Sequence, residues 1–235
     1  MKSKLKKFFI KNELKRHDFR VSIFGSARIK EEDQIYKDTF EIGKELGKMG
    51  IDLITGGGPC LMEAASLGHQ EGKKKSKNDH TSTIGLNIKL PFEQKPNRGV
   101  EAIVTHEHFS TRLDDFMLLS NVVVVTPGGI GTALEFFYTW QLIQVRHITR
   151  IPIVLVGEMW LDLIEWVKKW PLKVDYMNEE DMQYIFIANT SAEALDILKR
   201  AKIAFDEDGP EACVNWHLYG LTHPESKPVK GTKRP

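Results

Sequence analysis

The segment Thr126–Phe137, TPGGIGTALEFF, places glycines, a threonine and a carboxylate within a short stretch that follows the apolar run NVVVV. Glycines let a backbone approach a ligand closely, and free amides at a helix start offer an anion hydrogen-bond donors and positive potential. Glu135 stands one helical turn further on, where a carboxylate could stabilise a cation or activate water. Alternatively, Thr132–Glu135 forms a capping box, in which both side chains only satisfy amides at the helix start.

A second candidate lies upstream, in FSTRLDDFMLLSN. Thr111–Asp114 also fits the capping-box pattern, which places Arg112 in the first turn of a helix. A cation there opposes the helix dipole unless it has an anionic partner. Glu135 or a bound phosphate would supply that partner, whereas an ordinary exposed arginine is the alternative.

Two further glycine-rich segments follow apolar runs: FGSAR at residues 24–28 and TGGGPCLME at residues 55–63. Neither matches a dinucleotide or triphosphate signature, since no G-x-G-x-x-G follows the first predicted strand and no G-x-x-x-x-G-K-[ST] occurs. This argues against a hydride-transfer enzyme and a P-loop NTPase. A mononucleotide or a sugar phosphate fits better.

Short β-branched runs alternate with amphipathic segments along the chain, which predicts an α/β fold with a doubly wound parallel sheet and helices on both faces. In such a sheet the ligand lies at the carboxyl ends of the strands, where helix N-termini point at it. The glycine segments follow the first, second and fifth predicted strands. The candidate substrate-binding residues are Gly25, Ser26, Gly57, Gly58, Met62, Gly128, Gly129, Gly131 and Thr132.

The amino-acid composition limits the classes of binding partner that the protein can have. The chain has 235 residues, with 33 lysines and arginines against 32 acidic residues, so no global field calls for nucleic acid or an anionic membrane. Its two cysteines, Cys60 and Cys213, lack metal-ligand spacing and suit a reducing, cytoplasmic compartment. The HEH sequence at residues 106–108 has no third ligand at metal spacing, and no metal is expected.

Three regions are expected. Residues 1–19 read as a basic, solvated and partly helical arm, and residues 20–204 as one domain. Residues 205–235 lose periodicity and are expected to pack to about Leu221 before a loose tail. The segment GKKKSKNDHT, residues 72–81, is expected to be a solvated loop.

Assembled in this way, the sequence resembles the LONELY GUY (LOG) family, long labelled "possible lysine decarboxylase". The family motif P-G-G-x-G-T-x-x-E is present at Pro127–Glu135, with the upstream arginine at the expected spacing as Arg112. FGSAR, TGGGPCLMEAA and IGLNIKLPFEQKPN follow in family order, and the likeness covers roughly Val21–Ala201. Leu113 departs from a frequent lysine, and Cys60 from a frequent glycine.

The resemblance implies a Rossmann-like homodimer that hydrolyses the N-glycosidic bond of nucleoside 5′-monophosphates, AMP-like or cytokinin riboside monophosphates, without a cofactor. Gly129, Gly131 and Thr132 would then hold the 5′-phosphate, Glu135 would lie near the anomeric carbon, and Arg112 would orient Glu135 or the ribose. The decarboxylase label would require a lysine Schiff base with pyridoxal phosphate, and nothing singles out such a lysine. A nucleotide-binding regulatory protein and a carrier of a phosphorylated cofactor are the alternatives.

The predicted helix Ala133–Val145 is apolar on more than one side. It therefore favours burial against a second copy as well as against its own sheet. Burial wholly within one chain is the alternative.

Overall fold

The computed structural model describes residues 2–16, 18–91 and 95–209. Apolar, β-branched segments form one seven-stranded sheet, as the sequence predicts. The strands are β1 (Arg20–Phe24), β2 (Asp52–Thr55), β3 (Thr83–Ile88), β4 (Ala102–His106), β5 (Val122–Val125), β6 (Ile153–Val156) and β7 (Ile185–Ala188).

Helices occupy most of the connections between these strands. They are α1 (Lys2–Lys15), α2 (Gln34–Met49), α3 (Leu61–Ser76), α4 (Phe109–Leu119), α5 (Ile130–Gln144), α6 (Met159–Val167), the π-helical turn η1 (Lys168–Leu172), the 3₁₀ turn η2 (Glu179–Met182) and α7 (Ser191–Asp208).

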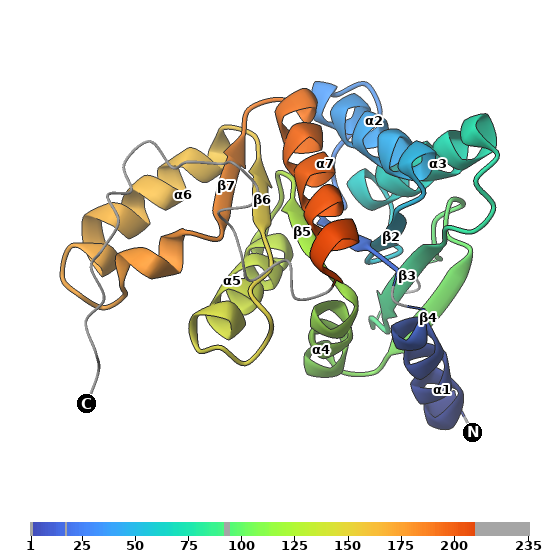
Figure 1. Ribbon diagram of the computed structural model, residues 1–235, viewed down its shortest axis with the longest axis horizontal. Helices are drawn as coiled ribbons and strands as arrows, with labels where there is room; N and C mark the ends of the chain where they lie inside the picture. The colour runs from blue at the N-terminus through green and yellow to red at the C-terminus, as the bar shows by residue number, and fades with distance from the viewer. Residues whose placement is uncertain (1, 17, 92–94, 210–235) are drawn as a thin grey trace.

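The sheet has the order β4-β3-β2-β1-β5-β6-β7, and every neighbouring pair is parallel. The chain first winds outward from β1 to β4 and then returns to place β5 on the other side of β1. This is a doubly wound sheet, and its switch point lies between β1 and β5, where such folds bind ligands at the carboxyl ends of the strands. The predicted fold class is confirmed (Figure 1).

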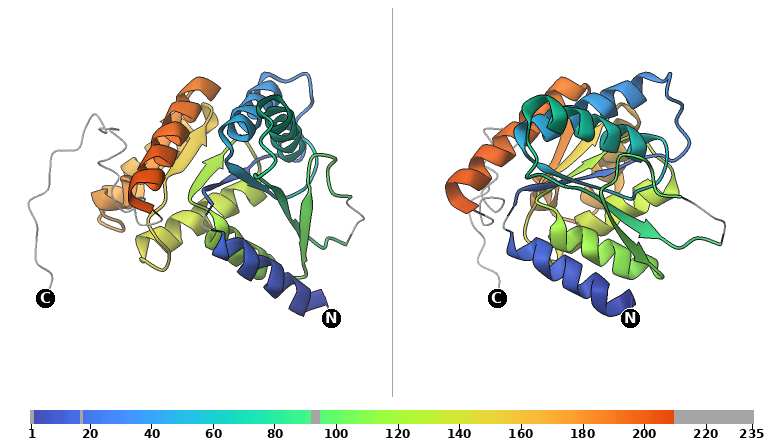
Figure 2. Two further views of the ribbon diagram at one scale, coloured as in Figure 1. Left: turned by 45° about the vertical axis from the view of Figure 1, so that its right-hand side comes forward. Right: turned by 90° about the vertical axis from the view of Figure 1, so that its right-hand side faces the viewer.

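Each face of the sheet carries its own core. On one face, α4, α5 and α6 contribute Phe116, Phe136 and Trp160, all essentially inaccessible to solvent. On the other, α2 and α7 contribute side chains such as Ile42 and Leu198. Helices cover both faces of the sheet (Figures 1 and 2). The strands are therefore rich in apolar residues, and β5, with the sequence VVVV, is buried along its whole length.

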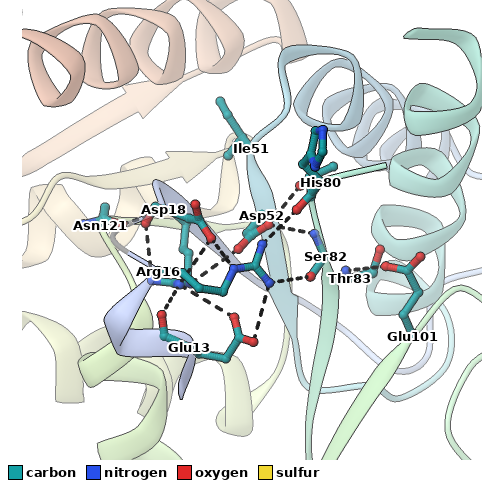
Figure 3. Close-up of polar contacts among 12 residues, drawn as sticks. Glu13, Arg16, Asp18, Ile51, Asp52, His80, Ser82, Thr83, Glu101 and Asn121 are labelled. Atoms are coloured by element: carbon teal, nitrogen blue, oxygen red, sulfur yellow. Dashed lines mark hydrogen bonds and ion pairs between the residues drawn. The ribbon is translucent and has the colours of Figure 1, made fainter. Parts of the chain in front are cut away.

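The N-terminal arm is more firmly docked than its sequence suggests. Its helix α1 buries Ile10 in the core beside α4, and Glu13 is also buried. Glu13 ion-pairs with Arg20 at the start of β1, and Arg20 ion-pairs with Asp52 at the start of β2. Figure 3 shows Glu13 and Asp52 within this group of polar contacts. The expectation of a solvated arm is therefore wrong for the last turns of α1.

Other boundaries differ from the sequence-based expectation. Residues 72–76 are helical, because α3 continues to Ser76 and ends where Lys77 takes a left-handed conformation, so only the rest of the predicted loop is irregular. Helix α7 runs past residue 204 to Asp208. The predicted packing of the chain as far as Leu221 falls outside the described residues. No helix in the described part of the chain is both long and apolar enough to span a membrane.

Candidate functional site

The three glycine segments meet at one edge of the sheet. They follow β1, β2 and β5, which are neighbours in the order β2-β1-β5. Backbone hydrogen bonds join them, from Ser26 N to the carbonyl of Pro127 at 3.1 Å and from Leu61 N to the carbonyl of Ser26 at 3.2 Å. The predicted convergence of these turns is present.

Glycine at position 25 is required by this close approach. A Cβ there would lie 2.2 Å from Thr126 Oγ1 and 3.1 Å from the Cβ of Leu61. The hydroxyl of Thr126 also donates to the carbonyl of Phe24, which fixes the turn after β5 against the turn after β1. Ser26 lies in the same turn, where its Oγ accepts a hydrogen bond from the amide of Arg28.

The start of α5 is open. Gly129 is the N-cap residue, and no side chain caps the helix there. A Cβ atom added at Gly129 or at Gly131 would have no other heavy atom within 4 Å. The first described intrahelical bond at this end runs from Ala133 N to Gly129 O. The preceding amides of α5 are therefore available to an anion.

Thr132 is buried beside Gly128, where a Cβ would lie 2.1 Å from the Thr132 hydroxyl oxygen. Neither side chain of the predicted capping box, Thr132 or Glu135, caps α5, so this alternative is wrong. The helix starts at Ile130, which places both residues too far into it to act as the two members of the box. The same holds for Thr111–Asp114, because α4 already starts at Phe109.

Glu135 instead pairs with Arg112. The Arg112 Nη1 donates to Glu135 Oε1 at 2.9 Å, and both residues are only 8% exposed. Arg112 Nε donates to the carbonyl of Leu86 at the end of β3, at 2.7 Å, and its guanidinium lies over the ring of Phe116. The cation in the first turn of α4 thus has the anionic partner that its position demands.

Burial raises the pKa of Glu135 above its usual value, and the Arg112 guanidinium opposes this shift through its charge and its hydrogen bond. Arg112 also reaches the second glycine turn, since a Cβ at Gly56 would lie 2.4 Å from its Nη2 and 2.7 Å from Met62 Sδ. One ion pair thereby connects α4, α5, β3 and the turn after β2.

Asn97 is a residue of this site that the sequence did not single out. It donates from Nδ2 to the carbonyl of Gly58 at 2.8 Å, and its own amide donates to the carbonyl of Gly57 at 2.9 Å. These bonds hold the turn after β2, in which Gly57 has a positive φ of 69°. Asn97 belongs to the KPN end of a quoted family segment, but no local pattern shows where that loop returns.

The structure shows what surrounds Leu113 and Cys60, the two residues that depart from the family pattern. Leu113 is buried on α4, so an apolar side chain suits the position. Cys60 precedes α3 with a positive φ of 61°, a conformation that favours glycine. Burial, followed by the charge of Glu63, raises the pKa of the Cys60 thiol, which disfavours a reactive thiolate.

Among the described residues, neither a cluster of metal ligands nor the buried Lys73 lies at this site. Within residues 2–16, 18–91 and 95–209, no group of three His, Cys, Asp or Glu side chains could hold a metal ion. Lys73 is buried, but it pairs with Glu101 at 2.7 Å, and Glu101 also accepts from the amide of Thr83. Thr83 begins β3, so this lysine lies at the opposite edge of the sheet from the glycine turns.

Comparison with known proteins gives one curated relative in several strains. The chain is 26% identical over 140 residues to the pyrimidine/purine nucleotide 5′-monophosphate nucleosidase of Escherichia coli strain K12. The match covers 58% of this chain and 30% of the relative. The chain therefore matches under a third of the relative's length.

Solved structures share the fold. The molybdenum cofactor carrier protein from Chlamydomonas reinhardtii is 22% identical, with a TM-score of 0.58 over 79% of this chain and 99% of that one. The molybdenum cofactor binding protein from Rippkaea orientalis is 19% identical, with a TM-score of 0.55 over 77% and 96%. Residues 62–198, more than half of the chain, match the family model described as possible lysine decarboxylase, and the chain therefore belongs to this family, the LOG family.

Proposed function

We propose that this protein hydrolyses the N-glycosidic bond of nucleoside 5′-monophosphates, giving a free base and ribose 5-phosphate. The observation that carries the proposal is the buried Arg112–Glu135 pair, which lies between the open start of α5 and the glycine turn after β2. Family membership and the distant nucleosidase relative support the same chemistry.

The 5′-phosphate binds at the start of α5 in this proposal. The exposed backbone of Gly129 and Gly131 and the hydroxyl of Thr132 supply donors, and the helix dipole adds positive potential. The absence of a Cβ at both glycines leaves room for the phosphate oxygens. The turns after β1 and β2 then flank the ribose and the base.

Glu135 acts at the anomeric carbon. As the bond from C1′ to the base nitrogen breaks, its electron pair leaves with the base and positive charge develops on the ribose. The Glu135 carboxylate stabilises that charge and accepts a proton from the water whose oxygen bonds to C1′. That proton then passes to the departing base nitrogen, which yields the neutral base and restores the carboxylate. Arg112 favours the ionised form of Glu135 and orients it, since it holds Oε1 while it is itself anchored on the carbonyl of Leu86.

The proposed assembly is a homodimer. Ile130, Leu134 and Phe137 form an exposed apolar stripe along α5, at helical spacings of four and three residues. Ile130 is 88% exposed although it is a large hydrophobic residue beside the site. Sedimentation equilibrium should give twice the 26.9 kDa chain mass, and Leu134→Asp should shift it to one chain. A monomer of the unaltered protein would contradict the dimer.

A carrier of a phosphorylated cofactor would use the same glycine turns, and two relatives in fold bind or carry the molybdenum cofactor. It would have no need for a buried carboxylate paired with an arginine. A regulatory nucleotide-binding protein would likewise bind without cleaving. The Arg112–Glu135 pair therefore favours hydrolysis over both.

Incubation with AMP, CMP and GMP, followed by chromatography, tests the proposal. We expect free base and ribose 5-phosphate in equal amounts, with adenosine cleaved far more slowly because it lacks the phosphate. Tight binding of AMP with no base released, at any pH between 5 and 9, would reject hydrolysis in favour of a binding protein.

A further inference from the structure

Asn87 carries a side-chain amide that forms no hydrogen bond with any described residue. Asn87 lies near the end of β3 and is 8% exposed, yet its amide has no hydrogen-bond partner in residues 2–16, 18–91 and 95–209. A Cβ at Gly57 would lie 3.4 Å from Asn87 Oδ1, so the amide stands directly beside the glycine turn after β2. The amide atoms of Asn87 are not among the fully buried polar atoms that lack a partner, so solvent reaches them and a ligand can take the place of that solvent.

The backbone at this position is fixed with respect to the Arg112–Glu135 pair. The preceding residue, Leu86, accepts the hydrogen bond from Arg112 Nε. His106 Nδ1 lies 3.1 Å from the carbonyl of Asn87, and His106 Nε2 lies 2.8 Å from Asp115 on α4. The backbone that carries the Asn87 side chain is thus held at a set place relative to Glu135 before any ligand binds.

The order of the strands places Asn87 away from the phosphate. Along the carboxyl edge, the turn after β5 comes first, then β1, then β2, and then the end of β3. Neighbouring strands lie about 4.8 Å apart, so β3 is roughly 14 Å from β5. A nucleotide with its phosphate at α5 and its anomeric carbon at Glu135 extends its base toward β2 and β3, where Asn87 lies.

We infer that the Asn87 amide binds the base of the nucleotide and sets which bases are accepted; this rests on the proposed function. A primary amide offers a donor and an acceptor side by side, and reversing it exchanges their positions. It therefore pairs with an amino base, such as adenine or cytosine, and with an oxo base, such as hypoxanthine. Asn87 accordingly gives broad acceptance of bases that present one donor and one acceptor on an edge.

The test is calorimetric binding of AMP, IMP and ribose 5-phosphate to the full-length chain. Asn87→Ala should weaken AMP binding about tenfold, since about 1.4 kcal/mol corresponds to a factor of ten. Ribose 5-phosphate, which has no base, should bind with unchanged affinity. An ionised Asn87→Asp side chain only accepts hydrogen bonds, so it can pair with the donor of adenine or of hypoxanthine but not with the acceptor beside it. AMP and IMP should therefore both bind more weakly than to the unaltered protein, while ribose 5-phosphate should keep its affinity.

Asn97→Ala is the matched control. Asn97 is another buried asparagine at the same turn, but its amide is already bonded to Gly58 and its Oδ1 accepts from Gly99 N. Its removal should distort the turn and weaken AMP and ribose 5-phosphate binding alike. Urea unfolding of each variant checks that the fold is intact, and if Asn87→Ala unfolds, the near-isosteric Asn87→Asp carries the test alone.

The outcomes separate the two proposals. The role in base recognition is overturned if Asn87→Ala weakens the binding of AMP and ribose 5-phosphate equally, or weakens neither. It is also overturned if Asn87→Asp binds AMP and IMP as tightly as the unaltered protein does. If the unaltered protein binds and cleaves AMP in those cases, the proposed function stands. If the unaltered protein binds no nucleotide, both fail.

Discussion

Arg112 and Glu135 approach to 2.9 Å from two helices on the same face of the sheet, although 23 positions separate them in the chain. Neither residue caps its helix. The pair is nine-tenths buried, so its charges are weakly screened by solvent and each partner strongly influences the ionisation of the other.

Glu135→Gln should abolish turnover while leaving the fold and AMP binding in place. Glutamine keeps the size and can still accept from Arg112, but it removes the charge that stabilises the ribosyl cation and the base that accepts a proton. General acid–base assistance alone contributes about 100- to 10,000-fold. Chromatographic assay of released base measures the loss, and calorimetry with AMP checks binding. A variant that releases base at the original rate would exclude a catalytic Glu135.

Removing Arg112 should alter the pH dependence of the rate. Burial already raises the pKa of Glu135, and Arg112 is the cation that opposes this shift. Hydrolysis needs the carboxylate, so the rate rises with pH as Glu135 loses its proton and falls below its pKa. In Arg112→Ala that pKa is higher still, and the acidic limb of kcat should move to higher pH. Arg112→Lys keeps a charge there and should move the limb less; equal profiles in all three proteins would contradict the pairing.

Gly131→Ala should separate phosphate binding from folding. Nothing lies within 4 Å of a Cβ there, and alanine in a helix is about 0.5–1 kcal/mol more stable than glycine. The added methyl occupies the space proposed for the phosphate, so AMP should bind more weakly while stability is kept or slightly raised. Gly25→Ala is the contrast: its Cβ meets Thr126 Oγ1 at 2.2 Å, and overpacking of this kind costs about 1–3 kcal/mol. Urea unfolding and AMP calorimetry on both variants check the contrast.

The charge cluster around Arg20 should make stability depend on pH. Burial raises the pKa of Glu13 and of Asp52, against the opposing effects of their arginine neighbours and, at Asp52, of hydrogen bonds from Ser82 and Thr81 (Figure 3). A carboxyl group whose pKa is raised in the folded state stabilises the fold below its unfolded pKa and loses that contribution as pH rises through the folded value. The free energy of unfolding of Glu13→Gln, relative to that of the unaltered protein, should therefore be higher at pH 8 than at pH 4.5. Urea unfolding at both pH values measures this difference.

Glu101→Gln provides the opposite case. Burial works to raise the pKa of Glu101, but hydrogen bonds from Lys73, from the Thr83 amide and from Gln70 outweigh it and lower the value. Stability from Glu101 is therefore present above its unfolded pKa and lost in acid. The same trend with pH in both variants would contradict the assignment for Glu13.

The sequence predicts the fold through features that are local. Each apolar β-branched run can be recognised from its own local sequence, and so can each glycine segment that follows three of these runs. A doubly wound sheet then brings the ends of β1, β2 and β5 together. The docking of α1 was not predictable, because it depends on Glu13 meeting Arg20 and Asp52 from separate elements.

The local pattern was misleading where a helix starts early. Thr132 and Glu135 have the spacing of a capping box, yet Gly129 ends the turn and the helix is under way before Thr132. The position of the Asn87 amide beside Gly57 depends on how β3 lies next to the turn after β2. The hydrogen bond from Asn97 to Gly58 depends on where the loop after β3 returns to that turn. Such contacts arise from the assembled sheet, so spacing along the chain does not reveal them.

The hydrogen bond from the Thr126 hydroxyl to the carbonyl of Phe24 joins residues 102 positions apart. Until β5 is made and inserted, β1 exposes one unpaired edge, and an exposed edge can pair with another chain. Non-local pairing of this kind slows folding, so the hazard lasts through much of synthesis on the ribosome. The short length of β1, five residues, limits that exposure.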